Sequence, residues 1–330
     1  MSVEAIIRTH DSILSRMTEA RDFLRGYFDP TPLVCAHNLS RRCGRLVYLK
    51  IESSLPTGSF KVRGALFALR SQLMRRAVSE VVTASTGNHG AAVAFAAREL
   101  GVLARIFLPT NPNPIKRAKI AALGAHIHEI GRDLAEAAEA AALYSNFHGA
   151  YFLDDASDDE VPIGTATIAS EIFEQLPSVQ GIYVPVGDSA LIRGIAAVAQ
   201  RRPEAPRIIG VQAARAPSYY DSWKAGKSIV SVVCDTIADG LATRRPRIEN
   251  VKALRELIDD MRLVTEQEML DAVRFLLVGE QIESEPSGAA ATAAVLKGEA
   301  TERSEPLVVI VTGCNITEEI RERALRHRDN

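Results

Sequence analysis

One stretch, residues 181–196, decides the fold class and reads GIYVPVGDSALIRGIA. Its first six residues are almost continuously apolar rather than alternating, which is typical of a strand buried on both faces in a parallel sheet. From residue 190 onward apolar residues recur at helical spacing, which predicts a helix directly after the loop. In open α/β sheets, loops at the carboxyl ends of the strands bind ligands.

Similar pairs of a short apolar run and a helical pattern follow one another along nearly the whole chain. The other predicted strands are LVYLKI (46–51), EVVTAS (80–85), ARIFLP (104–109), AHIHEI (125–130), RIIGVQA (207–213) and PLVVIVTG (306–313). Ala-rich stretches at 91–100, 133–143 and 165–176 predict helices between them. Thr265 and Glu268 predict a capping box for a helix that ends near Gly279. We therefore expect an α/β fold with right-handed crossovers.

Residues 73–149 contain three strand–helix units, enough for a small sheet of their own. We predict that they form a small domain, inserted into a larger cofactor-binding domain built from residues 1–72 and 150–330.

Composition narrows the class of protein. The 330 residues include 39 Lys and Arg against 41 Asp and Glu, a net charge of −2 that argues against nucleic acid or a membrane surface as the partner. The N-terminus has no apolar signal core, so we expect a cytoplasmic protein with its four cysteines reduced.

The first segment that indicates chemistry is TGSFKVRGA, residues 57–65, which lies between a predicted strand and a predicted helix. A lysine here, Lys61, would lie at the positive end of a helix dipole, where desolvation is expected to lower its pKa and free a nucleophilic amine. A second segment, STGNHG at 85–90, gathers N–H groups and hydroxyls at a helix start, as a carboxylate or phosphate requires.

Six ordered segments together resemble the fold type II family of pyridoxal-phosphate enzymes, in its threonine/serine dehydratase and serine racemase branch. They are TGSFKVRGA (57–65), STGNHG (85–90), VPVGDSALIRGIA (184–196), TIADGLA (236–242), ESEPSGAA (283–290) and VTGCN (311–315). The resemblance implies two open, mostly parallel twisted sheets flanked by helices, pyridoxal 5'-phosphate as cofactor, a small-molecule amino-acid substrate and a homodimer.

The resemblance also implies roles for individual residues. Lys61 would bind the cofactor covalently and remove the Cα proton, and Phe60 would pack against the cofactor ring. The substrate carboxylate would be held by Ser85, Thr86, Gly87, Asn88 and His89, of which Asn88 would also bond the cofactor's phenolic oxygen. Thr86 stands where the racemase branch has the serine acid/base of the opposite face. The phosphate would lie on the loop of Gly187, Asp188, Ser189, Ala190 and Leu191, with Glu285 near the ring and Thr312 facing its nitrogen.

The phosphate loop departs from the four glycines usual in that family, because Asp188, Ser189 and Ala190 replace three of them. A positive φ would strain Ala190. Asp188 has two possible orientations: outward, or into the site, where it would recognise a cationic or hydrogen-bond-donating group or act on the leaving group. We expect the outward one, because a carboxylate beside a phosphate is costly unless Arg193 compensates it.

No metal is expected. The acidic residues that bind a divalent cation in the racemase branch have no match in residues 210–217. Asp154, Asp155, Asp158 and Asp159 lack the glycine turn and distal glutamate of a calcium loop, so we expect them to be solvated at a helix entry.

The predicted activity is that of an ammonia-lyase that eliminates water from a β-hydroxy amino acid of the L-threonine or L-serine type, giving a 2-oxo acid and ammonia. The neutral Thr312 favours elimination over transamination, because it would not keep the ring nitrogen protonated. The alternatives are an amino-acid racemase, a β-eliminase specialised for 3-hydroxyaspartate or phenylserine, and a catalytically silent cofactor-binding homologue. Little sequence follows residue 315, so we expect no regulatory domain and no end-product inhibition by a branched-chain amino acid.

Overall fold

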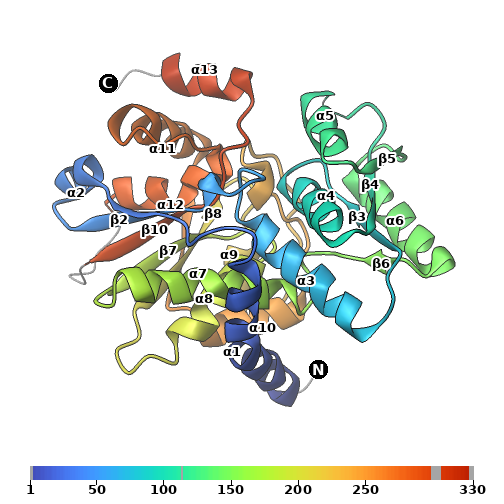
Figure 1. Ribbon diagram of the computed structural model, residues 1–330. Coiled ribbons are helices and arrows are strands. Elements are labelled where there is room, and N and C mark those ends of the chain that lie inside the picture. The colour runs from blue at the N-terminus through green and yellow to red at the C-terminus, as the bar shows by residue number, and fades with distance from the viewer. Residues whose placement is uncertain (1–2, 113, 299–305, 327–330) are drawn as a thin grey trace.

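The computed structural model describes residues 3–112, 114–298 and 306–326, and it contains two sheets flanked by helices (Figure 1). The larger sheet has six strands in the order β1-β2-β10-β7-β8-β9. Their bounds are Leu33–Cys35 (β1), Val47–Ile51 (β2), Leu307–Val311 (β10), Gly181–Pro185 (β7), Arg207–Ala213 (β8) and Asp260–Val264 (β9). All neighbours are parallel except β1 and β2, which are antiparallel, so the expected α/β fold is confirmed.

Helices cover both faces of this sheet because successive side chains of each strand point to opposite faces. On β10, Val308 and Ile310 face a core built with α1, α7 and α8, while Val309 and Val311 face a second core built with α2, α11 and α12. The helices are Val3–Leu24 (α1), Val161–Gln175 (α7), Ala190–Ala199 (α8), His37–Cys43 (α2), Glu266–Gly279 (α11) and Pro286–Leu296 (α12).

The smaller sheet is wholly parallel, in the order β5-β4-β3-β6. Its strands are His126–Glu129 (β5), Leu103–Leu108 (β4), Glu80–Ala84 (β3) and Tyr151–Phe152 (β6). Helices α4 (Asn88–Leu100) and α5 (Pro114–Ala122) lie toward one face and α6 (Leu134–His148) covers the other. The last strand of this sheet, β6, thus begins two residues beyond 149, and the domain limits drawn from the sequence stay a prediction.

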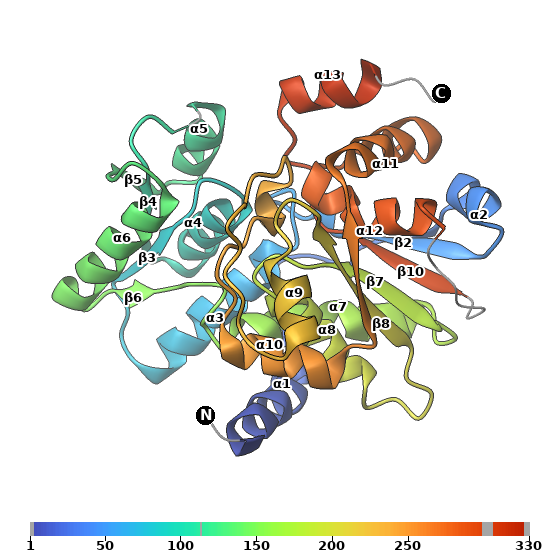
Figure 2. The same cartoon turned by 180° about the vertical axis from the view of Figure 1, so that it is seen from behind.

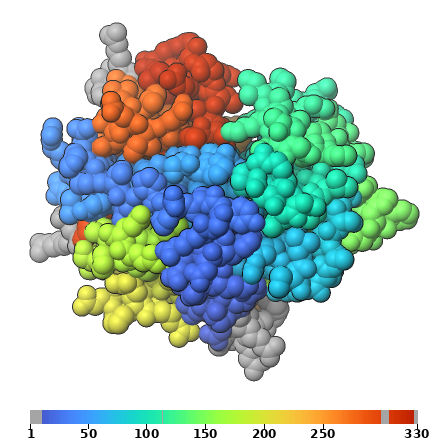
Figure 3. Space-filling model, in the orientation of Figure 1, coloured from blue at the N-terminus to red at the C-terminus, as the bar shows by residue number. Residues whose placement is uncertain are grey.

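The remaining helices pack against elements already described. Figure 2 shows α9 (Ser218–Ala225) and α10 (Ile248–Leu257) on the far side from Figure 1, and α13 (Glu318–Arg326) lies beside α11. In Figure 3 the blue N-terminal helix lies against α7 and α3 (Lys61–Arg75), both of which it contacts. None of the helices in the described ranges is long and apolar enough to cross a membrane.

The predicted elements occur where continuous apolar runs or helix signals mark them. The capping box of Thr265 and Glu268 is present, and its helix ends at Gly279 as predicted. Strands β1, β6 and β9 were not predicted, because these edge strands are short or partly exposed and lack a continuous apolar run.

A buried ion network joins the strand, turn and helix that precede the site. The guanidinium of Arg63 donates to Glu52 on the 3-10 turn η1 (Glu52–Ser54) and to Glu171 on α7, and Nζ of Lys50 on β2 donates to Glu171 at 2.6 Å. Lys50, Glu52 and Arg63 are at most 1% exposed and Glu171 is 5% exposed, so two cations and two carboxylates balance inside the protein.

This balance predicts the effect of removing one charge. Glu171→Gln leaves two buried cations with one carboxylate, and we expect it to lower the free energy of unfolding by about 3 to 5 kcal/mol in urea denaturation. Glu174→Gln is the matched control, because Glu174 lies on the same helix in exposed pairs with Arg21 and Arg25. It should cost less than about 1 kcal/mol. Equal losses of unfolding free energy in the two variants would show that the buried network stabilises the fold no more than an exposed ion pair does.

Candidate active site

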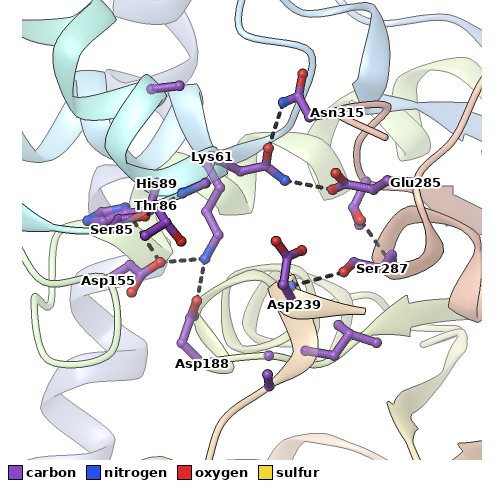
Figure 4. A pocket seen from close by; sticks show the side chains of 18 of the residues that line it. Lys61, Ser85, Thr86, His89, Asp155, Asp188, Asp239, Glu285, Ser287 and Asn315 are labelled. Carbon is purple, nitrogen blue, oxygen red and sulfur yellow. Dashed lines mark hydrogen bonds and ion pairs between the residues drawn. The ribbon is translucent and has the colours of Figure 1, made fainter. Parts of the chain in front are cut away.

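A cavity of about 380 Å³ lies where β3, β7 and β10 reach their carboxyl ends, with walls from both sheets. This volume lies in the range of small-molecule sites. Every residue predicted for the site lines it except Ala190. Figure 4 shows Lys61 reaching into the cavity, with Asp155 and Asp188 at its tip and Asp239 and Glu285 across from it.

Lys61 is the first residue of α3, and the end of β10 fixes the chain just before it. Phe60 N donates to Thr312 O at 3.0 Å, and Cys314 N donates to Gly58 O at 2.9 Å. These backbone hydrogen bonds bring residues 58–61 and 312–314 to one wall of the cavity. Their positions in the sequence did not predict this contact. The hydroxyl of Thr312 is buried and lies 3.5 Å from Ser287 O.

Two carboxylates receive the Lys61 ammonium. Its Nζ donates to Asp155 Oδ2 at 2.5 Å and to Asp188 Oδ2, and all three side chains are at most 17% exposed. Burial alone would lower the pKa of Lys61, but the charges of Asp155 and Asp188 outweigh it and hold that pKa above its usual range. The expectation of a lowered lysine pKa is therefore wrong for this state of the site, because it left out both carboxylates.

Asp155 is a site residue that the sequence interpretation missed. It was expected to be solvated, yet its carboxylate contacts Lys61 and lies 3.5 Å from Nδ1 of His89, whose Nε2 is 3.0 Å from Leu153 O. Burial tends to raise the pKa of Asp155, but the charges of His89 and Lys61 lower it to about 2. A cluster of four aspartates was the only local signal, and it did not distinguish the one that faces the cavity.

The expected outward orientation of Asp188 is also wrong. Its Oδ2 accepts from Lys61, and its Oδ1 accepts from the N–H of Ala190, at the N-terminus of α8, at 2.8 Å. Burial and the charge of Asp155 both raise the pKa of Asp188. Arg193 is buried on the next turn, but in the part of the chain that the structure describes no hydrogen bond joins it to Asp188.

The strain expected at Ala190 falls on Ser189 instead, which has φ +80°. A non-glycine residue in this conformation needs support from its surroundings. Tyr219 supplies it by donating its hydroxyl to Asp188 O at 2.9 Å, and Ser189 Oγ lies 3.4 Å from the same hydroxyl. Tyr219 is thus a loop-fixing residue within the protein.

A chain of amides leads from the cavity to Glu285. Asn315 Nδ2 donates to Asn88 Oδ1 at 2.6 Å, and Asn88 Nδ2 donates to Glu285 Oε1 at 2.6 Å. Glu285 is 4% exposed, and burial together with the charge of Asp239 raises its pKa to about 7. The carboxyl of Glu285 therefore changes its charge near neutral pH.

Comparison with known proteins fits this geometry. Residues 24–313 match the family model described as pyridoxal-phosphate dependent enzyme. The chain belongs to this family. It is 37% identical over 298 residues to an L-threonine ammonia-lyase of Geobacter sulfurreducens, covering 90% of this chain and 74% of that protein. It is 32% identical over 278 residues to a serine racemase of Arabidopsis thaliana, covering 84% of each. The structure of maize serine racemase superposes with a TM-score of 0.89 at 28% identity, over 94% of this chain and 96% of that one.

The cavity lining of this pyridoxal-phosphate enzyme fits the cofactor. Lys61 presents a primary amine for an aldehyde, and the first N–H groups of α8 have no partner within the helix and point toward the loop where a phosphate would bind. At Gly87 the nearest neighbour of an added Cβ would be Asp239 Oδ2, 4.0 Å away, which leaves room along the wall. Asp188 is a competing anion at the α8 N-terminus.

The buried carboxyl of Glu285 predicts a pH-dependent stability. Its ordinary pKa is 4.5 and its folded pKa about 7, so between these values the folded chain holds a proton that the unfolded chain has lost. The free energy of unfolding should therefore fall as pH rises from about 4.5 to about 7, by on the order of 3 kcal/mol at about 1.4 kcal/mol per pKa unit.

Glu285→Gln removes this dependence. We would measure the free energy of unfolding of the cofactor-free chains by urea denaturation at pH 5 to 8. The difference between wild type and Glu285→Gln should fall as the pH rises, whereas the difference between wild type and the exposed Glu283→Gln should not change with pH. Parallel pH profiles for wild type and Glu285→Gln would contradict the assignment.

Proposed function

We propose that this enzyme is an ammonia-lyase that removes water from a β-hydroxy amino acid of the L-threonine or L-serine type and yields a 2-oxo acid and ammonia. The observation that carries the proposal is Lys61 at the head of α3, facing the 85–89 loop across the cavity. The likeness to L-threonine ammonia-lyases, at 37% identity in the Geobacter protein, supports the reaction class.

Pyridoxal phosphate, when bound, supplies an electron sink for negative charge at Cα of an amino acid. The residues of the chain do the rest. Ser85, Thr86 and Asn88 offer hydroxyl and amide donors to the substrate carboxylate, with N–H groups at the start of α4. Lys61, as the free amine, takes the Cα proton, the β-hydroxyl leaves as water with one added proton, and the released enamine takes up water to give the 2-oxo acid and ammonia.

The uncharged Thr312 favours elimination. It is a buried hydroxyl beside the position proposed for the ring nitrogen, and a hydroxyl does not hold a proton on that nitrogen as a carboxylate would. The negative charge at Cα is then best discharged at once by loss of a β-substituent. We propose that Thr312 has this role.

Racemisation is the second candidate, supported by the likeness to serine racemases. It requires an acid or base on the face of the substrate opposite Lys61, and Thr86 lines the cavity with a hydroxyl. Incubation with L-serine separates the two reactions: elimination gives pyruvate and ammonia, whereas racemisation gives D-serine on chiral chromatography. A silent homologue would give neither product.

Lys61→Ala tests the nucleophile. We expect turnover of L-threonine or L-serine to fall by about 10³-fold or more, with the far-UV circular dichroism retained, because the covalent attachment and the base are lost together. The exposed Lys224→Ala should keep wild-type turnover. Borohydride reduction of the wild-type holoenzyme followed by peptide mapping should place the cofactor on Lys61; recovery on Lys50 or Lys116 would overturn the assignment.

A further inference from the structure

We propose that Asp155 and Asp188 determine specificity and select an amino acid whose side chain carries a short cationic group, namely an amine. This inference rests on the proposed function only in that the ligand is an amino acid bound beside Lys61. It narrows the substrate class within the family and treats both carboxylates as contacts for the substrate side chain.

The structure itself shows the two carboxylates binding a primary ammonium. Lys61 Nζ lies between Asp155 Oδ2 and Asp188 Oδ2 and donates to both. With Lys61 charged, the three groups carry a net charge of −1 on a wall whose side chains are 11 to 17% exposed. Buried carboxylates in this setting require a cation or a proton to compensate them.

Attachment of the cofactor removes that cation. When the Lys61 ammonium gives one proton to solvent and the amine condenses with an aldehyde, a C=N bond forms and water leaves with both remaining hydrogens. The nitrogen then carries at most one N–H, on protonation, and can no longer donate to two carboxylates. Asp155 then keeps His89 at 3.5 Å and Asp188 keeps the Ala190 N–H, but both would lose the ammonium that they share here.

The neighbouring cations replace it only in part. His89 lies 3.5 Å from Asp155, and the charge of Asp188 acts on Arg193, but no hydrogen bond joins Arg193 to Asp188 in the described chain. Lys116 and Lys119 line the cavity too, but Lys116 pairs with Asp239, and Lys119 donates to Asn315. In the proposed reaction Lys61 acts as the neutral amine, so an ammonium on the substrate is the cation that would compensate the two carboxylates.

The size of the cationic side chain follows from its place. Reaction at Cα occurs within reach of Lys61 Nζ, the atom that both carboxylates contact. A side chain of about two or three bonds from Cα is enough to bring an amine there. A second carboxylate on the substrate would instead meet Asp155 and Asp188, so 3-hydroxyaspartate is disfavoured by like-charge repulsion.

Binding of ligands without a β-hydroxyl tests the inference separately from elimination. We would titrate the wild-type holoenzyme with L-2,4-diaminobutyrate, L-2-aminobutyrate and L-aspartate, and measure each Kd from the change in the absorption of the bound cofactor. We expect the diamino acid to bind at least 10-fold more tightly than 2-aminobutyrate, with aspartate weakest. A ratio of one or less for the first two ligands overturns the inference without any variant.

Variants then show whether the two carboxylates cause the preference. Asp155→Asn and Asp188→Asn should each cut the preference for L-2,4-diaminobutyrate at least 3-fold, while Asp159→Asn, an exposed neighbour, should keep it. A preference unchanged in both pocket variants, or an equal loss of affinity for all three ligands, overturns the inference. Failure of the proposed function looks different, because the binding preference would persist while no β-hydroxy amino acid releases a 2-oxo acid.

Discussion

The placement of Lys61 depends on the burial of Arg63, two residues further along α3. Arg63 is 1% exposed, and its guanidinium is held by Glu52 and Glu171, so the first turn of α3 is tied to the end of β2 on one side and to α7 on the other. Two glycines make this crossing possible. A Cβ at Gly64 would lie 2.6 Å from Val161 Cγ1, and one at Gly164 would lie 2.5 Å from Arg63 O. Because both ends of the turn are fixed, packing directs the Lys61 side chain into the cavity, and a ligand does not have to order it.

The sequence predicted those parts of the fold in which local pattern and tertiary environment agree. Strands such as 307–311 are apolar on both faces because helices cover both faces, so a continuous run was enough to find them. The edge strands β1, β6 and β9 are short or partly exposed and lack that signal, whereas the edge strand β5 was predicted. The ordered motifs predicted which segments line the cavity, but they did not predict the contacts of Lys61 with Asp155 and Asp188. Asp155 is separated from Lys61 by 94 residues, and only the meeting of the two sheets brings their side chains together.

Asp188 shows why a residue change in a loop is hard to interpret before its geometry is known. From the sequence alone, repulsion between this carboxylate and a phosphate predicts an outward orientation. In the structure two groups stabilise the inward one: the N-terminus of α8 and the Lys61 ammonium. Positive φ at Ser189 turns the chain so that the carboxylate can reach both, and Tyr219 holds that turn. The three replacements of glycine thus act together and cannot be judged one at a time.

In the proposed reaction, the carboxylates that hold Lys61 also affect when it can act as a base. An amine paired with two carboxylates stays protonated, and a protonated amine cannot accept the Cα proton. In the proposed reaction Lys61 loses its proton more readily when another donor binds Asp155 and Asp188, because the carboxylates then attract that proton less strongly. A neutral substrate leaves the attraction largely in place and would react more slowly, whereas a cationic side chain weakens it when the base is needed. Selection at this wall of the cavity therefore bears on the rate of proton removal as well as on affinity, since the interaction differs between the bound state and the reacting state.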